Sequence, residues 1–189
     1  PTASNTLYKR AIPFTENLYL NAGVFKDGKL LGEVFTQEML FHKGIGAIIT
    51  IDKEPHKSYP GSGAAGLING VKGSDSRYGD REWLGFWCDD IEIEITFKEP
   101  TEINTIDLRF YHGPGQWIYT PKEFELFFTL ELGDTVYDRR EIKESGNNII
   151  EINYKLYKPK SITPKYNKLK ITIPNYGIIR KGKQSPDNK

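Results

Sequence analysis

The sequence has little cysteine and methionine, with one of each among its 189 residues. A single cysteine excludes an intrachain disulfide and a metal site built from several cysteines. We interpret Cys88 as a half-buried thiol without a chemical role. The sequence also lacks any apolar run near the ~20 residues that cross a bilayer, and no signal peptide opens it at Pro1. We therefore expect no membrane partner and treat the chain as a fragment whose export signal, if it has one, lies elsewhere.

A surplus of charge of either sign is also missing. The chain has 26 Lys and Arg against 25 Asp and Glu, for a formal net charge of +1. This balance gives no overall attraction to nucleic acid, so we expect no nucleic-acid partner. Aromatic residues are abundant, at 13%. Together with many Ile and Thr residues they favour strands over helices, and the composition predicts an all-β protein.

Strand patterns support this prediction along most of the chain. Residues 17–36 form a hairpin pattern around Asp27-Gly28, a pair that suits a type I′ turn. Apolar and polar residues alternate over 91–97, which predicts a half-buried strand. The alternation recurs at 106–110, 124–130, 150–154 and 169–173. Turn-rich joints separate most of these segments, which indicates an antiparallel β-sandwich without a long amphipathic helix.

Two unequal modules are expected, with a boundary near Phe41-His42-Lys43-Gly44, where the hairpin ends and a new strand, "IGAIITI", begins. Residues 1–42 are too few to bury a core alone. They therefore belong to a larger module or lean on residues 43–189. The polar tail at 180–189 is expected to fray.

A literal G-x-G-x-x-G motif occupies residues 61–66, but its context argues against nucleotide binding. The dinucleotide fingerprint needs a buried strand before it and a helix after it, so that the pyrophosphate meets a helix N-terminus. Here Lys57-Ser58-Tyr59-Pro60 precedes the motif, and Gly70 and Gly73 interrupt the segment after it. These glycines are expected to shape a loop that closes one end of the sandwich.

Catalytic patterns are weak as well. Glu92 and Glu94 lie on the solvated face of a predicted strand, where nothing would raise the pKa of a carboxyl group. No G-x-S-x-G motif is present, and His42, His56 and His112 lack metal-ligand spacing. We therefore predict that this fragment is not an enzyme.

Aromatic and polar residues beside turns suggest sugar binding instead. A sugar ring offers C–H faces for stacking and hydroxyls for hydrogen bonds, so sugar sites pair Trp or Tyr with Arg, His, Asn or Asp. Two segments carry such residues, 56–83 and 111–117. The candidate sugar-binding residues are Tyr59, Arg77, Tyr78, His112 and Trp117. The alternative for Trp83, Phe86 and Trp87 is that they plug the core.

A family resemblance enters at these residues. "YPGSGAAGLINGVKGSD" followed by "REWLGFWCDDIEIEITF" resembles the coagulation factor 5/8 type C (discoidin-like) domains attached to bacterial glycoside hydrolases. "GQWIYTPKEFEL" is similar to a second segment of that family, through Trp117, Ile118 and Pro121. Residues 1–42, with their "KDGK" hairpin, resemble part of the C-terminal immunoglobulin-like domain of chitobiases and β-hexosaminidases. The two modules often follow the catalytic domain of such enzymes in this order.

The resemblance implies a jelly-roll β-sandwich of the galactose-binding type over residues 43–189. It also implies a non-catalytic role in binding a terminal sugar of a glycan, with the catalytic domain of the parent enzyme as a partner. The implied location is periplasmic, cell-surface or secreted. The alternative is a structural spacer that packs on the catalytic domain and binds no sugar.

The resemblance further implies a structural calcium ion, with Asn69, Ser74 and Asp75 as candidate ligands. Asn69 stands where the family has Asp, which removes a negative charge although an amide oxygen can still bind calcium. The family's final strand, which carries an acidic residue near that loop, is also absent after Tyr176.

Overall fold

The computed structural model describes residues 1–143, 145–157 and 163–178, and this part of the chain is built from strands. In chain order they are β1 (Leu18–Lys26), β2 (Lys29–Met39), β3 (Ile48–Ile51), β4 (Ile91–Glu102), β5 (Thr105–Tyr111), β6 (Glu123–Leu130), β7 (Thr135–Glu141), β8 (Ile149–Lys155) and β9 (Lys165–Ile173). The helices of this part are two short 3₁₀ helices, η1 (Ala64–Ile68) and η2 (Pro114–Gln116). None of its helices is long and apolar enough to cross a membrane. The all-β prediction is confirmed.

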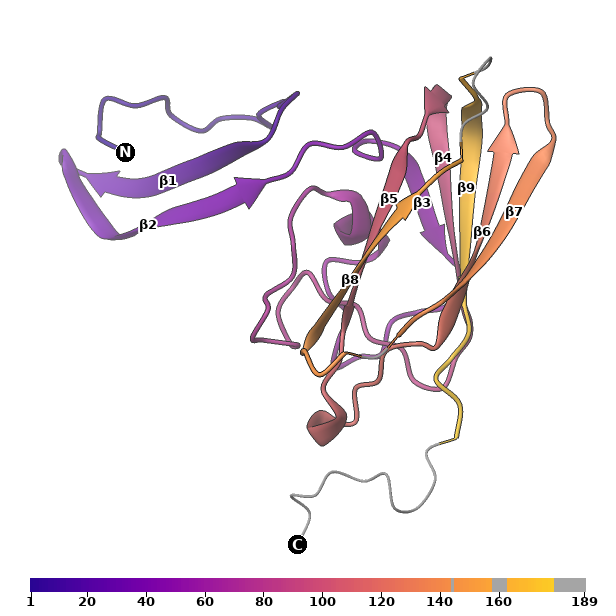
Figure 1. Ribbon diagram of the computed structural model, residues 1–189. Helices are drawn as coiled ribbons and strands as arrows, with labels where there is room; N and C mark the ends of the chain where they lie inside the picture. The colour runs from indigo at the N-terminus through magenta and orange to yellow at the C-terminus, as the bar shows by residue number, and fades with distance from the viewer. Residues whose placement is uncertain (144, 158–162, 179–189) are drawn as a thin grey trace, which may run out of the picture.

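Seven of these strands form a sandwich of two antiparallel sheets (Figure 1). The larger sheet has the order β3-β4-β9-β6-β7, and β5 pairs with β8 in the smaller one. Phe124, Leu126 and Phe128 of β6 are almost completely buried between the sheets. Phe128 stacks on Tyr154 of β8, with ring centroids 6.3 Å apart. The predicted β-sandwich is confirmed.

The alternation predicted for β4 is present in the structure. Ile91, Ile93 and Ile95 are buried in the core, and the residues between them face the other side of the sheet. There Lys170 Nζ lies 3.1 Å from a Glu92 carboxylate oxygen, and Lys168 pairs with Glu94 in the same way. The two glutamates therefore take part in surface ion pairs.

The edge strand β7 is the part of the sandwich that the sequence pattern does not predict. Of the described strands it pairs with β6 only, and all but one of its residues are exposed. Asp138, Arg139 and Arg140 interrupt its apolar alternation. Charged residues commonly keep an edge strand from pairing with other chains, and here they also hide the strand pattern. The predicted fraying of residues 180–189 lies outside the described residues.

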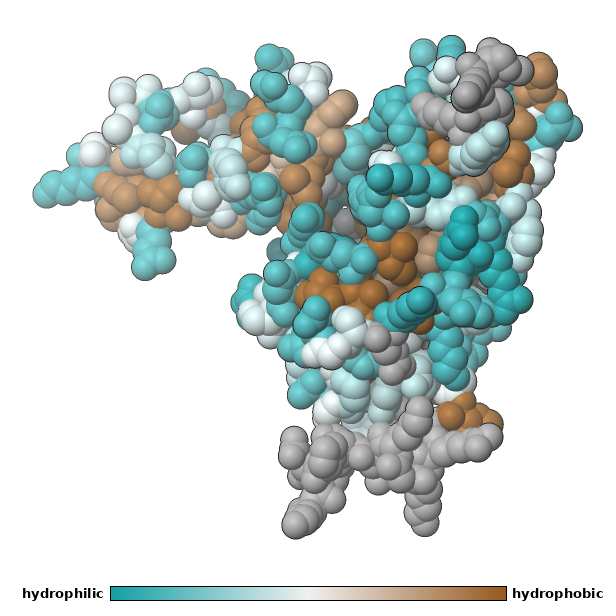
Figure 2. All heavy atoms as spheres, viewed as in Figure 1, coloured by the Kyte–Doolittle hydropathy of each residue, from teal (hydrophilic) through white to brown (hydrophobic). Residues whose placement is uncertain are grey.

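The N-terminal hairpin forms a separate two-stranded sheet. Asp27 and Gly28 have φ values of 50° and 76°, which confirms the predicted type I′ turn. A hydrogen bond of 2.7 Å from the Leu40 N–H to the Gly70 carbonyl joins the hairpin to the sandwich. Several apolar side chains of the hairpin are exposed, and Figure 2 shows them along its strands. The boundary at residue 42 and the immunoglobulin-like assignment stay predictions.

The strand register gathers many connections at one end of the sandwich, the lower end in Figure 1, which we call the loop end. At this end β3, β5 and β9 finish, while β4, β6 and β8 begin. The loop end consists of residues 52–62, 85–90, 112–122, 145–148 and 174–178. Most of the predicted sugar-binding residues lie here or directly beside it.

Candidate functional site

The glycine-rich segment between η1 and β4 contains no strand, as its sequence predicts. Leu108 and Phe110 of β5 pack against the core, so the alternate residues Arg109 and Tyr111 point outward. The segment covers these outward side chains. Our expectation that it closes one end of the sandwich is therefore wrong for most of its length, because it covers the outer face of β5 and reaches the loop end only at residues 85–90.

Side-chain hydrogen bonds give this segment its shape. The Asp80 carboxylate accepts hydrogen bonds from the backbone N–H groups of Ser74, at 2.6 Å, and of Glu82, at 2.9 Å. The Asn69 amide accepts one from the Val71 N–H and donates one to the Glu82 carboxylate, both at 2.8 Å. Local side-chain bonds of this kind replace the backbone ladder that a strand would provide.

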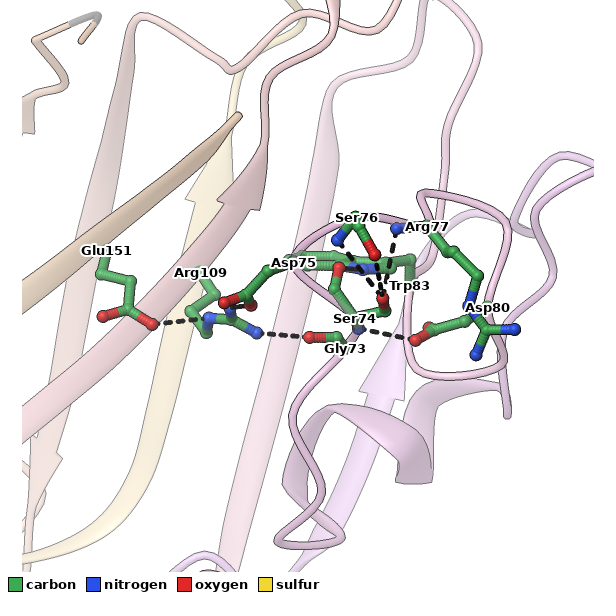
Figure 3. Close-up of polar contacts among 9 residues, drawn as sticks. All are labelled: Gly73, Ser74, Asp75, Ser76, Arg77, Asp80, Trp83, Arg109 and Glu151. Atoms are coloured by element: carbon green, nitrogen blue, oxygen red, sulfur yellow. Dashed lines mark hydrogen bonds and ion pairs between the residues drawn. The ribbon is translucent and has the colours of Figure 1, made fainter. Parts of the chain in front are cut away.

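Arg109 ties the segment to the small sheet (Figure 3). Its guanidinium donates to the Gly73 carbonyl at 2.7 Å and to Glu151 of β8 at 2.7 Å, and it forms an ion pair with Asp75. It also lies over the Trp83 ring, 5.3 Å from the centroid. The Arg109 side chain is only 15% exposed. We call these five residues the arginine clamp.

Two glycines allow close approaches that no other residue would permit. A Cβ atom on Gly73 would lie 2.5 Å from the Trp83 ring, and the Trp83 indole N–H donates to the Ser74 carbonyl at 2.9 Å. A Cβ atom on Gly85 would lie 2.8 Å from the Cβ atom of Tyr59. Both glycines therefore press the segment against an aromatic side chain.

Six rings form a row that runs from Trp83 of the arginine clamp to Trp87 of the loop end. Neighbouring centroids are between 5.5 and 6.2 Å apart. In order, the rings belong to Trp87, His56, Tyr59, Tyr78, Tyr111 and Trp83. Edge-to-face and tilted pairs at these distances are favourable, so the row holds its members in fixed positions.

A second loop follows β5 and carries Trp117. The backbones of Gly113 and Ile118 exchange two hydrogen bonds, of 2.9 and 3.1 Å, and close this loop. Trp117 has a left-handed backbone with φ of 61°, which a bulky residue rarely adopts, and it is 52% exposed. The nearby His112 ring accepts a hydrogen bond of 3.4 Å from the Thr120 N–H through Nδ1.

Several polar groups around these rings have no partner in the part of the chain that the structure describes. Among the described residues, nothing forms a hydrogen bond or an ion pair with the Arg77 guanidinium, His56 Nε2 or His112 Nε2. Figure 3 shows the Arg77 side chain leaving the loop on the side away from Arg109. These groups are free to bond a ligand, whereas the polar groups of Asp80 and Arg109 are engaged in holding the loop.

The structure brings some predicted site residues together and leaves others apart. Tyr59 and Tyr78 are neighbours in the row, with centroids 6.1 Å apart, and Arg77 precedes Tyr78. His112 and Trp117 belong to the second loop, and none of the observed contacts joins them to the first three residues. Tyr111, a residue outside the candidate set, contacts Tyr78 and directly precedes His112 in the chain.

Several residues of the site were not among the candidates, including Arg109, Glu151, Tyr111 and Trp87. Arg109 occupies an outward position of a regular strand, a position that is usually solvated. The core-plug alternative holds for Phe86, which packs against the core. It is wrong for Trp87, which is 71% exposed, because the backbone leaves the path of a regular strand at Cys88, whose φ is 59°.

The G-x-G-x-x-G motif does not have the geometry of a dinucleotide site. β3 ends at Ile51, ten residues before Gly61, and the motif leads into the five-residue η1. Gly61 and Gly63 have positive φ values, 54° and 72°. The glycines therefore shape a turn, and a helix N-terminus suited to a pyrophosphate is missing here.

The side chains implied as calcium ligands already bond other groups of the protein. Asn69 Oδ1 accepts the Val71 N–H, the Ser74 hydroxyl accepts backbone N–H groups, and Asp75 pairs with Arg109. No group of three or more His, Cys, Asp or Glu side chains is placed to hold a metal ion in the described ranges. Because calcium takes about six to eight oxygen ligands, the three side chains do not form a ligand set as arranged. Calcium binding stays a prediction.

An open depression of about 760 Å³ lies beside the arginine clamp. Its walls include Asp75, Arg109, Lys143 and Glu151 and residues 145–150. The exposed tryptophans do not line it. It is therefore a feature of the small sheet's outer face, separate from the aromatic part of the loop end.

Comparisons with known proteins leave the family open. No family model and no curated protein matches the sequence. The lectin domain of lectinolysin complexed with Lewis B antigen is a similar solved structure, with 14% identity, a TM-score of 0.45, and coverage of 70% of this chain and 84% of that one. A mutant of the same domain complexed with Lewis b gives 14% identity, a TM-score of 0.44, and coverage of 72% and 88%. At this level of similarity we draw no functional argument from them.

Proposed function

We propose that this chain binds carbohydrate at the loop end and the adjoining turn at residues 77–78, through Trp117, Tyr78, Arg77 and His112. The observation that carries the proposal is a half-exposed tryptophan on an unusual backbone, with polar side-chain groups nearby that bond no atom of the described residues. An indole kept in water costs free energy unless a ligand covers it, and strained backbone is typical of ligand sites.

The roles follow from side-chain chemistry. Trp117 or Tyr78 stacks on a C–H face of the sugar ring. Tyr59 holds the Tyr78 ring in position through an edge-to-face contact. The Arg77 guanidinium and His112 Nε2 bond sugar hydroxyls. Each hydrogen bond contributes about 0.5–1.5 kcal/mol, so we expect weak affinity for a single sugar.

We further propose that the chain is a non-catalytic accessory region of an exported bacterial glycoside hydrolase. The support is the resemblance of residues 1–42 and 43–189 to two modules that follow such catalytic domains. The parent would be of the β-N-acetylhexosaminidase, chitobiase or α-L-fucosidase type, located in the periplasm, on the cell surface or outside the cell.

A structural spacer is the second candidate function. Exposed apolar side chains on the hairpin, among them Val24, Leu31 and Phe35, favour it, because a face of this kind suits packing against another domain. The two functions differ in one respect that is easy to measure. A pure spacer leaves every loop-end residue unaffected by sugars.

The test is a titration followed by NMR. Galactose, N-acetylglucosamine and fucose are added separately, and the side-chain signals of Arg77, Tyr78, His112 and Trp117 are recorded. We expect at least one sugar to shift them saturably, and Trp117→Ala to abolish the response. Tyr157→Ala, which removes an exposed ring beyond the opposite end of β8, is the control that retains it. Flat signals for all four residues with every sugar would remove the proposal.

The same proteins can be screened on a glycan array with and without calcium. If calcium is structural, its removal lowers both the melting temperature and the array signal, and Asp75→Asn lessens the calcium dependence. Equal melting temperatures in calcium and in chelator would reject the calcium prediction without touching sugar binding.

A further inference from the structure

The outer end of the aromatic row, formed by Trp87 and His56, is not used by the proposed function. The two rings lie 5.5 Å apart between centroids, with 33° between their planes. Trp87 is nonetheless 71% exposed. The imidazole therefore contacts only part of the indole, and most of the indole faces water.

The position of this pair is fixed by backbone hydrogen bonds. The His56 N–H donates to the Gly85 carbonyl at 2.7 Å, and the Gly85 N–H donates to the Tyr59 carbonyl at 3.0 Å. A third bond of 2.7 Å, from the Tyr59 N–H to the His56 carbonyl, closes the turn between them. The indole is thus presented by a rigid support, which lowers the entropic cost of binding.

The backbone next to Trp87 is also unusual. Among the described residues, three that are not glycine have positive φ: Asp27, Cys88 and Trp117. Asp27 is explained by its hairpin turn, whereas the other two positions place exposed tryptophans at the loop end. Each such conformation costs roughly 1 kcal/mol or more, and this cost is commonly found at ligand sites.

The surroundings of Trp87 favour a sugar over an apolar partner. Lys57 and Ser58, which follow His56 in the chain, and Asp89, two residues after Trp87, are polar and exposed, which disfavours a broad apolar patch around the indole. The acidic Asp89 and Asp90 disfavour an anionic lipid surface. A single flat ring beside polar groups matches a pyranose, which has one apolar face and a rim of hydroxyls.

We propose that Trp87 and His56 form a second sugar subsite at the loop end. A pyranose ring stacks its C–H face on the open side of the indole, and one of its hydroxyls bonds His56 Nε2. This inference rests on the proposed function and deepens it, because two aromatic platforms make the preferred ligand an oligosaccharide with at least two accessible rings.

The experiment uses the three tryptophan indole N–H signals of the full chain, assigned with Trp83→Phe, Trp87→Phe and Trp117→Phe. The probes are galactose, N-acetylglucosamine, fucose and N,N′-diacetylchitobiose. We expect a binding sugar to shift the Trp87 and Trp117 signals and to leave Trp83 in place. Trp117→Ala retains the Trp87 shift. His56→Ala lowers the sugar affinity measured from that shift about tenfold, which corresponds to ~1.4 kcal/mol.

Failure of this inference and failure of the proposed function give different results. A Trp87 signal that stays flat while Trp117 responds overturns the second subsite only. Loss of the Trp87 shift in Trp117→Ala also overturns it. A Trp87 signal that responds to vesicles of phosphatidylcholine and phosphatidylserine, and to no sugar, would identify a membrane contact instead. Flat signals at both tryptophans overturn the two proposals together.

Discussion

Replacing Arg109 with methionine should destabilise the protein, because it removes every polar contact of the arginine clamp and keeps most of the side chain's bulk. The largest loss is the charged hydrogen bond to the Gly73 carbonyl, which contributes about 1.5–3 kcal/mol. The contact with the Trp83 ring adds about 0.5–1 kcal/mol.

The two ion pairs of Arg109 add little to this loss. Asp75 and Glu151 are 81% and 58% exposed, so their carboxylates regain water when the guanidinium is removed. Pairs of this kind contribute about 0–1 kcal/mol. We therefore expect Arg109→Met to lower the free energy of unfolding by about 3 kcal/mol, which is roughly 6–12 °C in melting temperature for a chain of this size.

The assay is urea unfolding at pH 7, with Arg140→Met as a matched control. Arg140 also pairs with a carboxylate, of Asp138, and lies over the Tyr154 ring at 5.2 Å. Its side chain is 54% exposed, so the same replacement should cost only about 1 kcal/mol or less. An equal loss of unfolding free energy in the two variants, or a loss below ~0.5 kcal/mol for Arg109→Met, would refute the reasoning. The contribution of an arginine would then not depend on how exposed its side chain is.

Three other predictions concern local packing, protonation and domain structure. Gly73→Ala should cost about 1–3 kcal/mol in urea unfolding because its Cβ meets the Trp83 ring, whereas Gly79→Ala, which meets nothing within 4 Å, should be close to neutral; equal costs would contradict the contact. Burial lowers the pKa of His42 below 6.5, so the unfolded chain binds this proton more readily and the free energy of unfolding should fall as the pH drops below 6.5; an equally steep fall in His42→Gln would contradict this. Residues 43–189 alone should keep a cooperative unfolding transition, and its loss would show that the hairpin is part of the sandwich.

The sequence predicts the frame of the protein because its strands follow a period of two. Ile91, Ile93 and Ile95 alternate with charged residues, and the core is built on that face. The hairpin is equally clear, since Asp27-Gly28 is one of the few pairs that suit its turn. In both cases the decisive contacts lie close together in sequence.

The arginine clamp could not be predicted in this way. The carboxylates that pair with Arg109 are 34 and 42 residues away, on a loop and on another strand. An arginine at an outward strand position has the pattern of an ordinary solvated residue. The position becomes mostly buried because the glycine-rich segment crosses β5 there.

The exposed tryptophans show a second limit. Trp83, Phe86 and Trp87 are all typical core residues, and composition alone cannot say which of them faces water. The outcome depends on Gly85, which fixes the backbone against Tyr59, and on the turn at Cys88. These details come from tertiary contacts, so the site was predicted in part and Trp87 was missed.

The most direct test of sugar binding at the loop end compares the full chain with a double variant, Trp87→Ala and Trp117→Ala, on one glycan array. We predict that the unmodified chain binds one or more glycans and that the double variant binds none, while its melting temperature is unchanged. Undiminished glycan binding by the folded double variant, or no binding by the unmodified chain, would contradict the account.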